Sequence, residues 1–476
     1  MRKLLFILVA LLTAQHTFAQ PSQIKRTWHW YFGNRAGIDF SSGTAVADTN
    51  GALITSEGCA AISDTAGNLQ FYSDGRTVWN RLHQIMPNGT GIMGGALGSS
   101  TQQALIIPKP LSPNLYYLFT TDEAENQGAN GMRYSVIDMN LDGGNGDIIN
   151  SQKNILLFAP CTEKLAAVNH CNDTSVWVMG HEVNNNHFRT YLLTSNGIDT
   201  NAVISAVGHN NPVNVQGGVQ GLIKFSPDGK MVCAVNDSFA QKVELFEFDN
   251  ITGYVFNGFL LVADYPQIQS ISFAPNNTML YVGQQGSNKL MRQFNVLVFD
   301  SITIINSANI VSPTINRGFR ALLNSSVGKL FCLEAALILA DSMLCAIENP
   351  DIYGINCSLN LNFSNAGTWQ FGSNLPNFNE SYFRQFQSTN CTTGITEYNY
   401  DFIKVFPNPP RDWIYLEGSG ITSVALFDVF GRVIINQKTD AVSLLHKLNV
   451  STLSNGMYVL IATTKNQTLS SKIIKQ

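Results

Sequence analysis

One pattern recurs through most of the chain and constrains its fold more than any other feature. Between about residues 28 and 387, an apolar strand is followed by a turn rich in Pro, Asn, Asp and Gly, and then by a second apolar strand. The clearest copies are residues 222–235 and 271–282, and weaker copies surround the turns at 66–68, 112–114, 171–173 and 326–328. Pro presets φ for the first turn position, and Asp-Gly or Asn supplies the strained one, so each copy predicts a β-hairpin.

The spacing of these turns is roughly fifty residues, which is typical of a propeller blade rather than of a helical repeat. A small sheet cannot bury both faces alone, so successive sheets must stack around an axis. Six turns predict six blades, and a seventh is expected from the strand at 27–32 together with late strands around 369–386. We therefore expect an all-β fold with a six- or seven-bladed β-propeller. A β-sandwich array or a β-helix is the alternative, but these need shorter turn spacings.

Two sets of residues in this region resemble known propellers. The turn at 225–230, Phe-Ser-Pro-Asp-Gly-Lys, resembles those of WD40-like and lactonase-like repeats. The segments 32–40, 56–60, 72–75 and 78–80 are similar to the opening of secreted propeller proteins. The resemblance implies an architecture but no activity, because propellers host binding proteins, hydrolases, lyases and oxidoreductases.

The last part of the chain, residues 401–476, reads as a separate small all-β module. Three prolines at 407, 409 and 410 break the arriving strand, and short β-branched or aromatic runs follow at 413–417, 422–429, 432–437, 457–463 and 468–475. The pattern resembles the type A C-terminal sorting domain of type IX secretion cargo, through Pro407, Asn408, Pro409, Gly431, Arg432, Gly456, Tyr458 and Lys472. The resemblance implies an immunoglobulin-like β-sandwich that addresses the chain to the type IX export machinery.

The N-terminus is consistent with export. Arg2 and Lys3 precede an apolar run at 4–12, and Thr17-Phe18-Ala19 offers a signal-peptidase site, so we expect a signal peptide at 1–19. The expected order is then a propeller at 20–386, a polar linker at 387–400 and the sorting domain at 401–476. No later run is long enough to span a bilayer, so we expect no transmembrane segment in the mature chain. The protein should be secreted through the periplasm to the cell surface or the extracellular medium.

The net charge limits the classes of partner, and the cysteine content bears on disulfides and metal sites. A formal net charge of −4 with 13% charged residues argues against nucleic acid. Eight cysteines in an exported chain allow disulfides. We expect Cys59, Cys233 and Cys332 to be core thiols, Cys161–Cys171 and Cys345–Cys357 to be candidate pairs, and Cys391 to be able to tether the linker to the propeller. No Cys/His ladder has zinc spacing, so neither a structural metal nor a cofactor is expected.

Few residues form a pattern that is typical of a catalytic or metal-binding site. His181, Glu182 and His187 resemble metal ligands by type, but the spacing and Asn184–Asn186 favour a turn with solvated histidines; His181 or Glu182 is the residue there most worth testing. Asp142 and Asp147 place two carboxylates, which are calcium ligands, in one short loop, although a Gly-rich connection between strands is the simpler interpretation. Asp74 lies in a segment like a sialidase Asp-box with altered spacing, which we interpret as a blade turn.

Four carboxylates lie nearest strand-like segments that could line a central channel: Glu57, Asp74, Glu163 and Glu334. No spacing singles out a catalytic pair. Glu57, Asp74, His181 and Glu334 are therefore weak catalytic candidates, and neither a nucleophile elbow nor a phosphate loop is present.

Three functions are compatible with these observations. We expect a secreted or cell-surface protein that binds an extracellular glycan or protein ligand without chemistry, on long Asn/Gly-rich loops. The alternative is an extracellular hydrolase or lyase acting on carbohydrate or a lactone at the propeller channel. A third hypothesis is a structural adhesin with no ligand pocket.

Overall fold

A computed structural model gives the structure of the chain. It describes residues 23–212, 218–236, 242–262, 268–285, 290–312, 318–335, 343–364, 374–385, 391, 404–406, 409–417, 421–428, 432–440, 443, 445–464 and 468–475. The chain divides into two compact units, Met1–Cys391 and Thr392–Gln476. The expected signal peptide at 1–19 lies outside the described residues, as does the expected linker except for Cys391.

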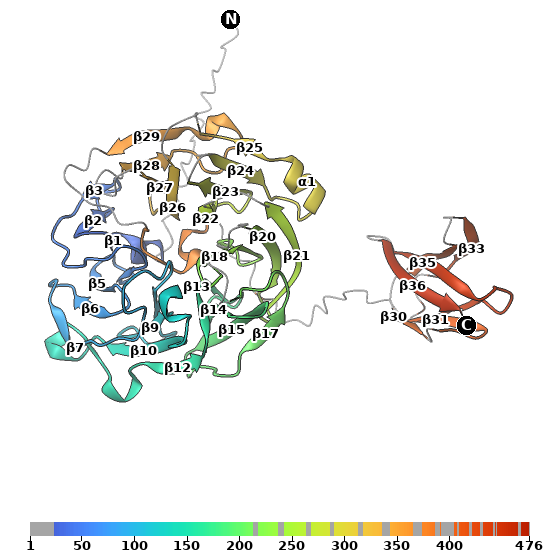
Figure 1. Cartoon of the computed structure of the whole chain (residues 1–476), viewed down its shortest axis with the longest axis horizontal. Coiled ribbons are helices and arrows are strands. Elements are labelled where there is room, and N and C mark those ends of the chain that lie inside the picture. Colours follow the sequence, from blue (N-terminus) through green and yellow to red (C-terminus); the bar gives the residue numbers. More distant parts are fainter. Residues whose placement is uncertain are drawn as a thin grey trace, which may run out of the picture. The chain divides into compact units, whose positions relative to one another are not determined.

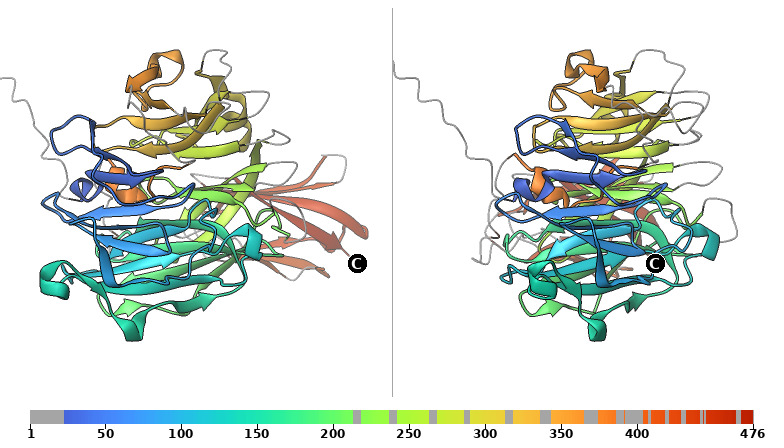
Figure 2. Two further views of the ribbon diagram at one scale, coloured as in Figure 1. Left: turned by 60° about the vertical axis from the view of Figure 1, so that its left-hand side comes forward. Right: turned by 90° about the vertical axis from the view of Figure 1, so that its left-hand side faces the viewer.

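The first unit is a ring of small antiparallel sheets around a common centre (Figures 1 and 2). The described residues form seven sheets in chain order. Sheets 1 to 3 comprise β1 (His29–Phe32), β2 (Ala36–Asp39) and β3 (Val46–Ala47); β4 (Ala60–Ser63), β5 (Leu69–Ser73), β6 (Thr77–Asn80) and β7 (Ile85–Thr90); and β8 (Ala104–Pro108), β9 (Leu115–Thr120), β10 (Met132–Asp138), β11 (Asp147–Ile148) and β12 (Ile155–Phe158).

Sheets 4 to 7 continue the ring. They comprise β13 (Cys161–Asn169), β14 (Val176–Glu182), β15 (His187–Thr194), β16 (Gly197–Ile198) and β17 (Val203–Ala206); β18 (Gly221–Phe225), β19 (Met231–Asn236), β20 (Lys242–Asp249) and β21 (Tyr254–Val262); β22 (Ile268–Phe273), β23 (Met279–Gln284), β24 (Met291–Asn295) and β25 (Asn309–Ile310); and β26 (Gly318–Asn324), β27 (Leu330–Ala335), β28 (Met343–Ile347) and β29 (Leu359–Ser364). Short helices lie outside the strands: η1 (Ile24–Thr27), η2 (Ala124–Asn126), η3 (Asp142–Gly144), η4 (Asn150–Gln152), α1 (Ser301–Asn306), η6 (Ile355–Cys357) and η7 (Glu380–Phe383).

In sheets 2 to 7 the first strand lies nearest the centre and the later strands lie progressively outward (Figure 1). The first strand of sheet 5, β18, is buried at every position, whereas four of the nine residues of the outermost strand β21 are exposed. Apolar clusters fill the space between neighbouring sheets, for example between sheets 5 and 6. We call the side of the ring where these first strands begin the leading face, and the side where they end the trailing face.

The six predicted turns are confirmed. Each joins the first and second strands of one sheet, from the β4–β5 hairpin to the β26–β27 hairpin. At the Pro-Asp-Gly turn of sheet 5, Gly229 has φ +70° and donates its N–H to Ser226 O. A β-carbon at that φ is strained, which explains why Gly occupies this position.

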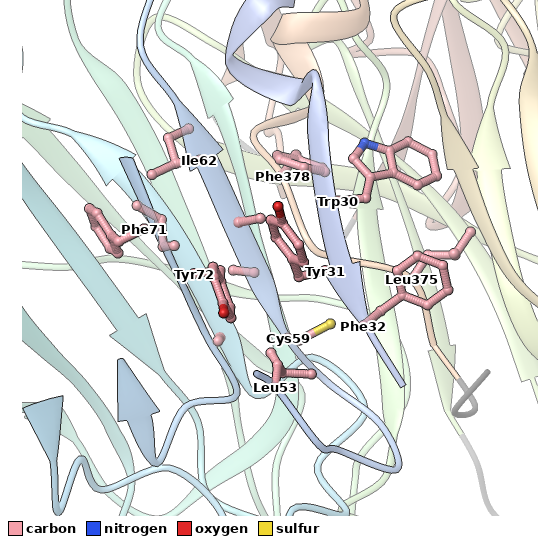
Figure 3. Close-up of a cluster of buried hydrophobic side chains, with 14 of the residues drawn as sticks. Trp30, Tyr31, Phe32, Leu53, Cys59, Ile62, Phe71, Tyr72, Leu375 and Phe378 are labelled. Carbon is pink, nitrogen blue, oxygen red and sulfur yellow. The ribbon is translucent and has the colours of Figure 1, made fainter. Parts of the chain in front are cut away.

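In the described residues the ring closes differently from the expectation, and positions 369–373 of the expected late strands lie outside those residues. The strand predicted at 27–32 exists as β1, but the described part of the late segment, 374–385, forms no strand. Aromatic packing joins sheet 1 to sheet 7 instead, because the ring centroids of Trp30 and Phe40 lie 5.7 and 5.6 Å from that of Phe331. Trp30 also lies 6.3 Å from Phe378 of the late segment (Figure 3). Among the described residues, side-chain packing rather than strand pairing therefore joins sheet 1 to sheet 7.

The second unit contains two antiparallel sheets. One is β30 (Lys404–Phe406), β31 (Trp413–Glu417) and β34 (Leu445–Asn449); the other, in spatial order, is β33 (Val433–Lys438), β32 (Ile421–Asp428), β35 (Gly456–Thr464) and β36 (Thr468–Lys475). Both sheets contribute to one core, in which Ile414 and Leu448 belong to the first sheet and Leu426 and Leu460 to the second. The five predicted strands lie within about two residues of observed ones, and the strand expected to arrive at the prolines is β30, but β34 was missed.

Candidate functional site

The centre of the ring is occupied by the chain itself. On the leading face, Asn374 Nδ2 donates to Thr101 O at 3.0 Å, and Asn377 N donates to Cys59 O at 2.8 Å. Thr101 and Cys59 come shortly before β8 and β4, the first strands of sheets 3 and 2. The late segment therefore begins at the leading end of the central strands.

The same segment ends at the trailing face. Asn379 Nδ2 donates to Asn169 Oδ1 at 2.7 Å, at the end of β13, and Ser381 Oγ donates to Pro227 O at 3.2 Å, after β18. Gln385 N donates to Pro275 O at 3.4 Å, after β22. Residues 374–385 thus pass along the axis of the ring, and we call them the axial segment.

Side-chain amides satisfy the inner edges of the central strands. Asn377 Nδ2 donates to Leu165 O on β13 at 2.9 Å. Gln102 accepts from the N–H groups of Leu165 and Ile223 and donates to Ile223 O on β18. These contacts matter because buried backbone groups without partners are costly. One cavity at the axis, of about 40 Å³ and lined partly by Leu375 and Asn377, has room for a few waters but not for a sugar.

A buried ion pair fixes the axial segment. Lys224 Nζ of β18 lies 2.5 Å from Glu380 Oε1 of η7, and the two side chains are 9% and 2% exposed. Burial raises the pKa of Glu380, and the charge of Lys224 opposes that shift only in part. The pair therefore depends on both partners remaining in place.

Two of the four carboxylates predicted near the channel serve local structure. Asp74 accepts from the backbone N–H groups of Arg76 and Thr77 and pairs with the Arg76 guanidinium at 2.8 Å, as expected for a blade turn. Glu163 is fully buried and accepts from Thr101 N, Thr101 Oγ1 and Ala124 N at 2.7–3.0 Å. Burial outweighs these hydrogen bonds and raises the pKa of Glu163 to about 7.

The other two carboxylates have different neighbours. Glu57 is half-buried in the loop before β4, and its charge opposes the fall in the pKa of Arg320 that burial causes. Glu334 is buried on β27, where one of its oxygens lies 4.0 Å from Cys345 Sγ. The structure thus gives each nominated acid its own local partner and does not single out a catalytic pair.

The histidines at the β14–β15 hairpin differ from each other. His187 is 37% exposed and lies 3.4 Å from Glu182, as a turn histidine should. His181 was expected to be solvated, and this is wrong. Its side chain is buried, its Nδ1 lies 2.6 Å from Glu182 O, and its ring packs 4.6 Å from Phe188. Desolvation and the nearby charge of Lys164 lower the pKa of His181 to about 3, so the imidazole is neutral near pH 7.

Sequence reasoning missed the partners of His181. Lys164 is fully buried, and its Nζ donates to Asn211 Oδ1 at 2.9 Å and to Gln220 O at 3.2 Å. Asn211 Nδ2 in turn lies 3.3 Å from the His181 ring nitrogens. A fully buried lysine is rare unless paired, but its position in an apolar strand gave no hint of its partners.

The aspartates of the Gly-rich loop do not converge on a common point. Asp147 is buried and accepts from Asn88 N, Asn88 Nδ2 and Ile148 N, whereas Asp142 is exposed at the start of η3. Among the described residues, one group of three His, Cys, Asp or Glu side chains has its ligand atoms close together: His170, Cys171 and Cys391. Two of these form a disulfide with each other, so the group offers no metal-binding thiolates in this state.

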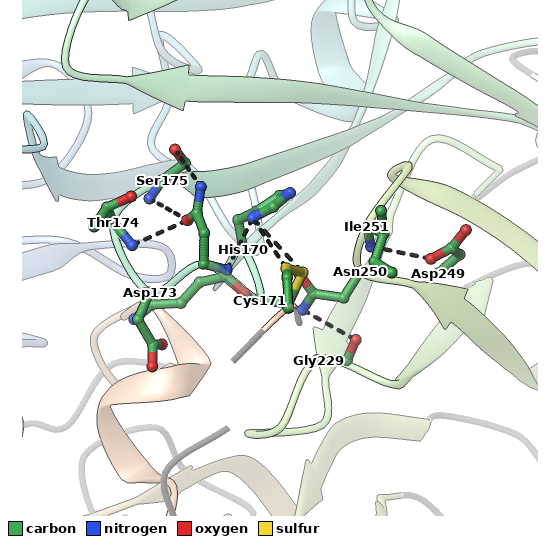
Figure 4. Close-up of a disulfide and its surroundings, with 12 residues drawn as sticks. His170, Cys171, Asp173, Thr174, Ser175, Gly229, Asp249, Asn250 and Ile251 are labelled. Carbon is green, nitrogen blue, oxygen red and sulfur yellow. Dashed lines mark hydrogen bonds between the residues drawn. A yellow bond between two sulfur atoms is a disulfide. The ribbon is translucent and has the colours of Figure 1, made fainter. Parts of the chain in front are cut away.

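The Cys171–Cys391 disulfide lies on the trailing face and joins residues 220 apart (Figure 4). His170 Nδ1 lies 3.8 and 3.9 Å from the two sulfurs. The expected tethering role of Cys391 is confirmed. The expected pairs Cys161–Cys171 and Cys345–Cys357 are wrong for this structure, in which Cys161, Cys345 and Cys357 are buried thiols, as are Cys59, Cys233 and Cys332.

Several residues of the sorting motif can be placed. Tyr458 OH donates to Ser454 O at 2.8 Å, Arg432 pairs with Asp428 at 2.7 Å, and Gly456 begins β35. Pro409 is exposed, and Lys472 lies on β36 opposite Val459. Pro407, Asn408 and Gly431 lie outside the described residues.

Comparison with known proteins assigns the second unit. The family described as "Secretion system C-terminal sorting domain" matches residues 404–476. This match indicates handling by the type IX secretion machinery and export to the cell surface or extracellular space. Among the described residues, no helix has both the length and the apolar character needed to cross a membrane.

No curated protein sequence matches the chain, and the following solved structures resemble it distantly. Hsv2 from Kluyveromyces lactis is 11% identical with a TM-score of 0.37, covering 71% of this chain and 95% of its own. A protein from Bacteroides fragilis provisionally named 6-phosphogluconolactonase is 10% identical with a TM-score of 0.38, covering 83% and 98%. TolB from Acinetobacter baumannii is 10% identical with a TM-score of 0.32, covering 52% of each chain. Similarities this weak carry no inference about activity.

Proposed function

We propose that the chain is a type IX secretion cargo whose first unit is a seven-bladed β-propeller that binds an extracellular glycan or protein without chemistry. In this proposal the second unit is an immunoglobulin-like β-sandwich that serves as the export address. Residues 1–19 are the signal peptide, 20–386 the propeller, 387–400 the linker and 401–476 the sorting domain.

The observation that carries the binding proposal is the axial segment. A hydrolase or lyase at the channel needs an open cavity with convergent acids. Here residues 374–385 occupy the axis, and Asp74 and Glu163 are engaged in local hydrogen bonds. Recognition is therefore expected on the loops of a face rather than in the channel.

The leading face offers a suitable hollow. It has a volume of about 370 Å³ and lies between sheets 3 and 4, lined by Gln127, Ala129, Ala159, Pro160, Val183 and Asn184. That volume is within the range of small-ligand sites. The lining combines amides with apolar carbon and carries no formal charge, which suits a neutral sugar or an uncharged peptide segment.

A binding screen tests this proposal. The exported full chain is applied to an array of neutral and acidic polysaccharides and, in parallel, to chromogenic glycosides and lactones. We expect saturable binding without turnover. Ala129→Trp, which fills the hollow, should weaken binding at least tenfold, whereas Ala66→Trp, at an equally exposed turn on the trailing face, should not. Turnover that saturates with substrate would favour the hydrolase or lyase alternative.

The export address is tested separately. Deletion of residues 401–476 should leave the first unit folded, by circular dichroism, and retained in the periplasm, by fractionation, because the two units have separate cores. Normal surface delivery of the truncated chain would contradict the assignment of the sorting domain.

A further inference from the structure

Two buried thiols face each other across the last sheet. Cys332 on β27 and Cys345 on β28 are directly opposite in the antiparallel register, and neither side chain is exposed to solvent. Their side chains hydrogen-bond to each other. Directly opposite residues of an antiparallel pair have Cα atoms about 4.5 or 5.5 Å apart, and disulfides form at about 4.4–6.8 Å. The backbone therefore already has the spacing that a disulfide needs.

The alternative partner of Cys345 is engaged elsewhere. The sequence suggested Cys357, but the Cys357 thiol hydrogen-bonds with the Tyr281 hydroxyl. Cys357 also lies in η6, outside the β27–β28 ladder. Although all three thiols belong to one apolar cluster between sheets 6 and 7, register brings Cys332 rather than Cys357 opposite Cys345.

We propose that Cys332 and Cys345 are oxidised to a second, cross-strand disulfide during export. The oxidant is a disulfide-bearing thiol oxidoreductase of the periplasm. One cysteine thiolate attacks the oxidoreductase disulfide to give a mixed disulfide, and the other cysteine then displaces the enzyme. The chain loses two protons and two electrons, and the enzyme disulfide is reduced to a dithiol.

The order of events follows from burial. In the folded ring both sulfurs are inaccessible, and burial and the neighbouring thiol raise the pKa of Cys332 well above its ordinary value, which suppresses the reactive thiolate. Oxidation therefore precedes the packing of sheet 7 against sheet 6. Once the sheets close, the same burial protects the bond from reductants.

Peptide mapping of the wild-type full chain, exported through an oxidising periplasm, tests the proposal without any variant. The protein is denatured with N-ethylmaleimide and without reductant, and is then digested with trypsin and a glutamate-specific protease. Cleavage after Lys329, Glu334, Glu348 and Glu380 places Cys332, Cys345 and Cys357 on separate peptides, 330–334, 335–348 and 349–380. We expect 330–334 joined to 335–348, and 349–380 alkylated. Alkylation of all three peptides, or a link between 335–348 and 349–380, would overturn the proposal.

A second measurement separates the proposed bond from the one already present. Under native conditions a phosphine reductant should open Cys171–Cys391, whose two residues are partly exposed, and leave the buried Cys332–Cys345 intact until urea unfolds the ring. The variant Cys332→Ser is the matched control, since it should leave Cys345 alkylated without reduction and Cys171–Cys391 unchanged. Equal reduction of both bonds in the native protein would contradict the inferred order of events.

Discussion

Removing one member of the Lys224–Glu380 pair should release the axial segment. At 2.5 Å and an effective dielectric constant near 20, the attraction between the charges is roughly 7 kcal/mol, which offsets a desolvation cost of several kcal/mol per ion. The net contribution of the pair is therefore small, but loss of one partner leaves an uncompensated buried charge. We expect Lys224→Met to cost about 3–5 kcal/mol.

The pH dependence of this loss has a definite sign. Burial already raises the pKa of Glu380, and removal of Lys224 removes the interaction that opposes the shift. A carboxyl group whose pKa is higher in the folded state favours folding at low pH, and this contribution is lost as pH rises through the folded pKa. The cost of Lys224→Met should thus be larger at pH 8 than at pH 5.

Hydrogen exchange of the axial segment at increasing urea concentrations is the appropriate assay, because it measures release of residues 374–385 independently of the second unit. Lys230→Met is the matched control, since Lys230 is 76% exposed and lies 3.7 Å from Asp228, where an ion pair contributes less than about 1 kcal/mol. The double variant Lys224→Met/Glu380→Leu should recover most of the loss. Equal effects of Lys224→Met and Lys230→Met would refute the role of the buried pair.

Three further predictions concern buried groups. Because the pKa of Glu163 is raised to about 7, the stability of the wild type relative to Glu163→Gln should fall by about 3 kcal/mol between pH 4.5 and 8 in urea titrations; a pH-independent difference would contradict this. His181, with a pKa lowered to about 3, favours folding above pH 6.5 and loses that contribution as pH falls, so His181→Asn should move the acid-unfolding midpoint, followed by circular dichroism, to lower pH; an unchanged midpoint would count against it. Cys391→Ser removes a cross-link between residues 220 apart, so it should lower the free energy of unfolding by up to about 5 kcal/mol and expose the axial segment to protease. Reduction of the wild type should have the same effect, and no effect of reduction would contradict this prediction.

Local chemistry explains which parts of the fold could be predicted. The six hairpins were visible because Pro, Asn, Asp and Gly restrict φ within a few residues, and that restriction does not depend on the rest of the chain. Strand β34 was missed because it is only five residues long and its two buried positions are His446 and Leu448, so its sequence shows no alternation of apolar and polar residues. The disulfide partner of Cys391 was missed because the pairing depends on where the axial segment leaves the ring, a property of the assembled ring rather than of spacing.

The buried polar group around His181 was not predicted, for a related reason. His181, Lys164 and Asn211 come from three separate segments, and a polar residue in an apolar strand looks the same in sequence whether it faces water or a buried partner. The same ambiguity affected Glu163, which lies on the innermost strand β13 and is held by loop backbone. Sequence patterns identify buried strands well, but they do not identify which polar groups those strands enclose.

The composition of the axial segment shows how a non-strand peptide can cross the centre of a ring of sheets. The innermost strands have one ladder partner each, so their inner edges present backbone groups that need hydrogen bonds. Asn377 donates its side-chain amide to Leu165 O of β13, and Asn374 donates to Thr101 O just before β8, while Asn379 binds the Asn169 side chain at the end of β13. Leu375 and Phe378 fill the apolar space between. An asparagine-rich, aromatic segment after the last hairpin is thus suited to closing the axis, and a closed axis leaves the loops of the leading face as the place for recognition.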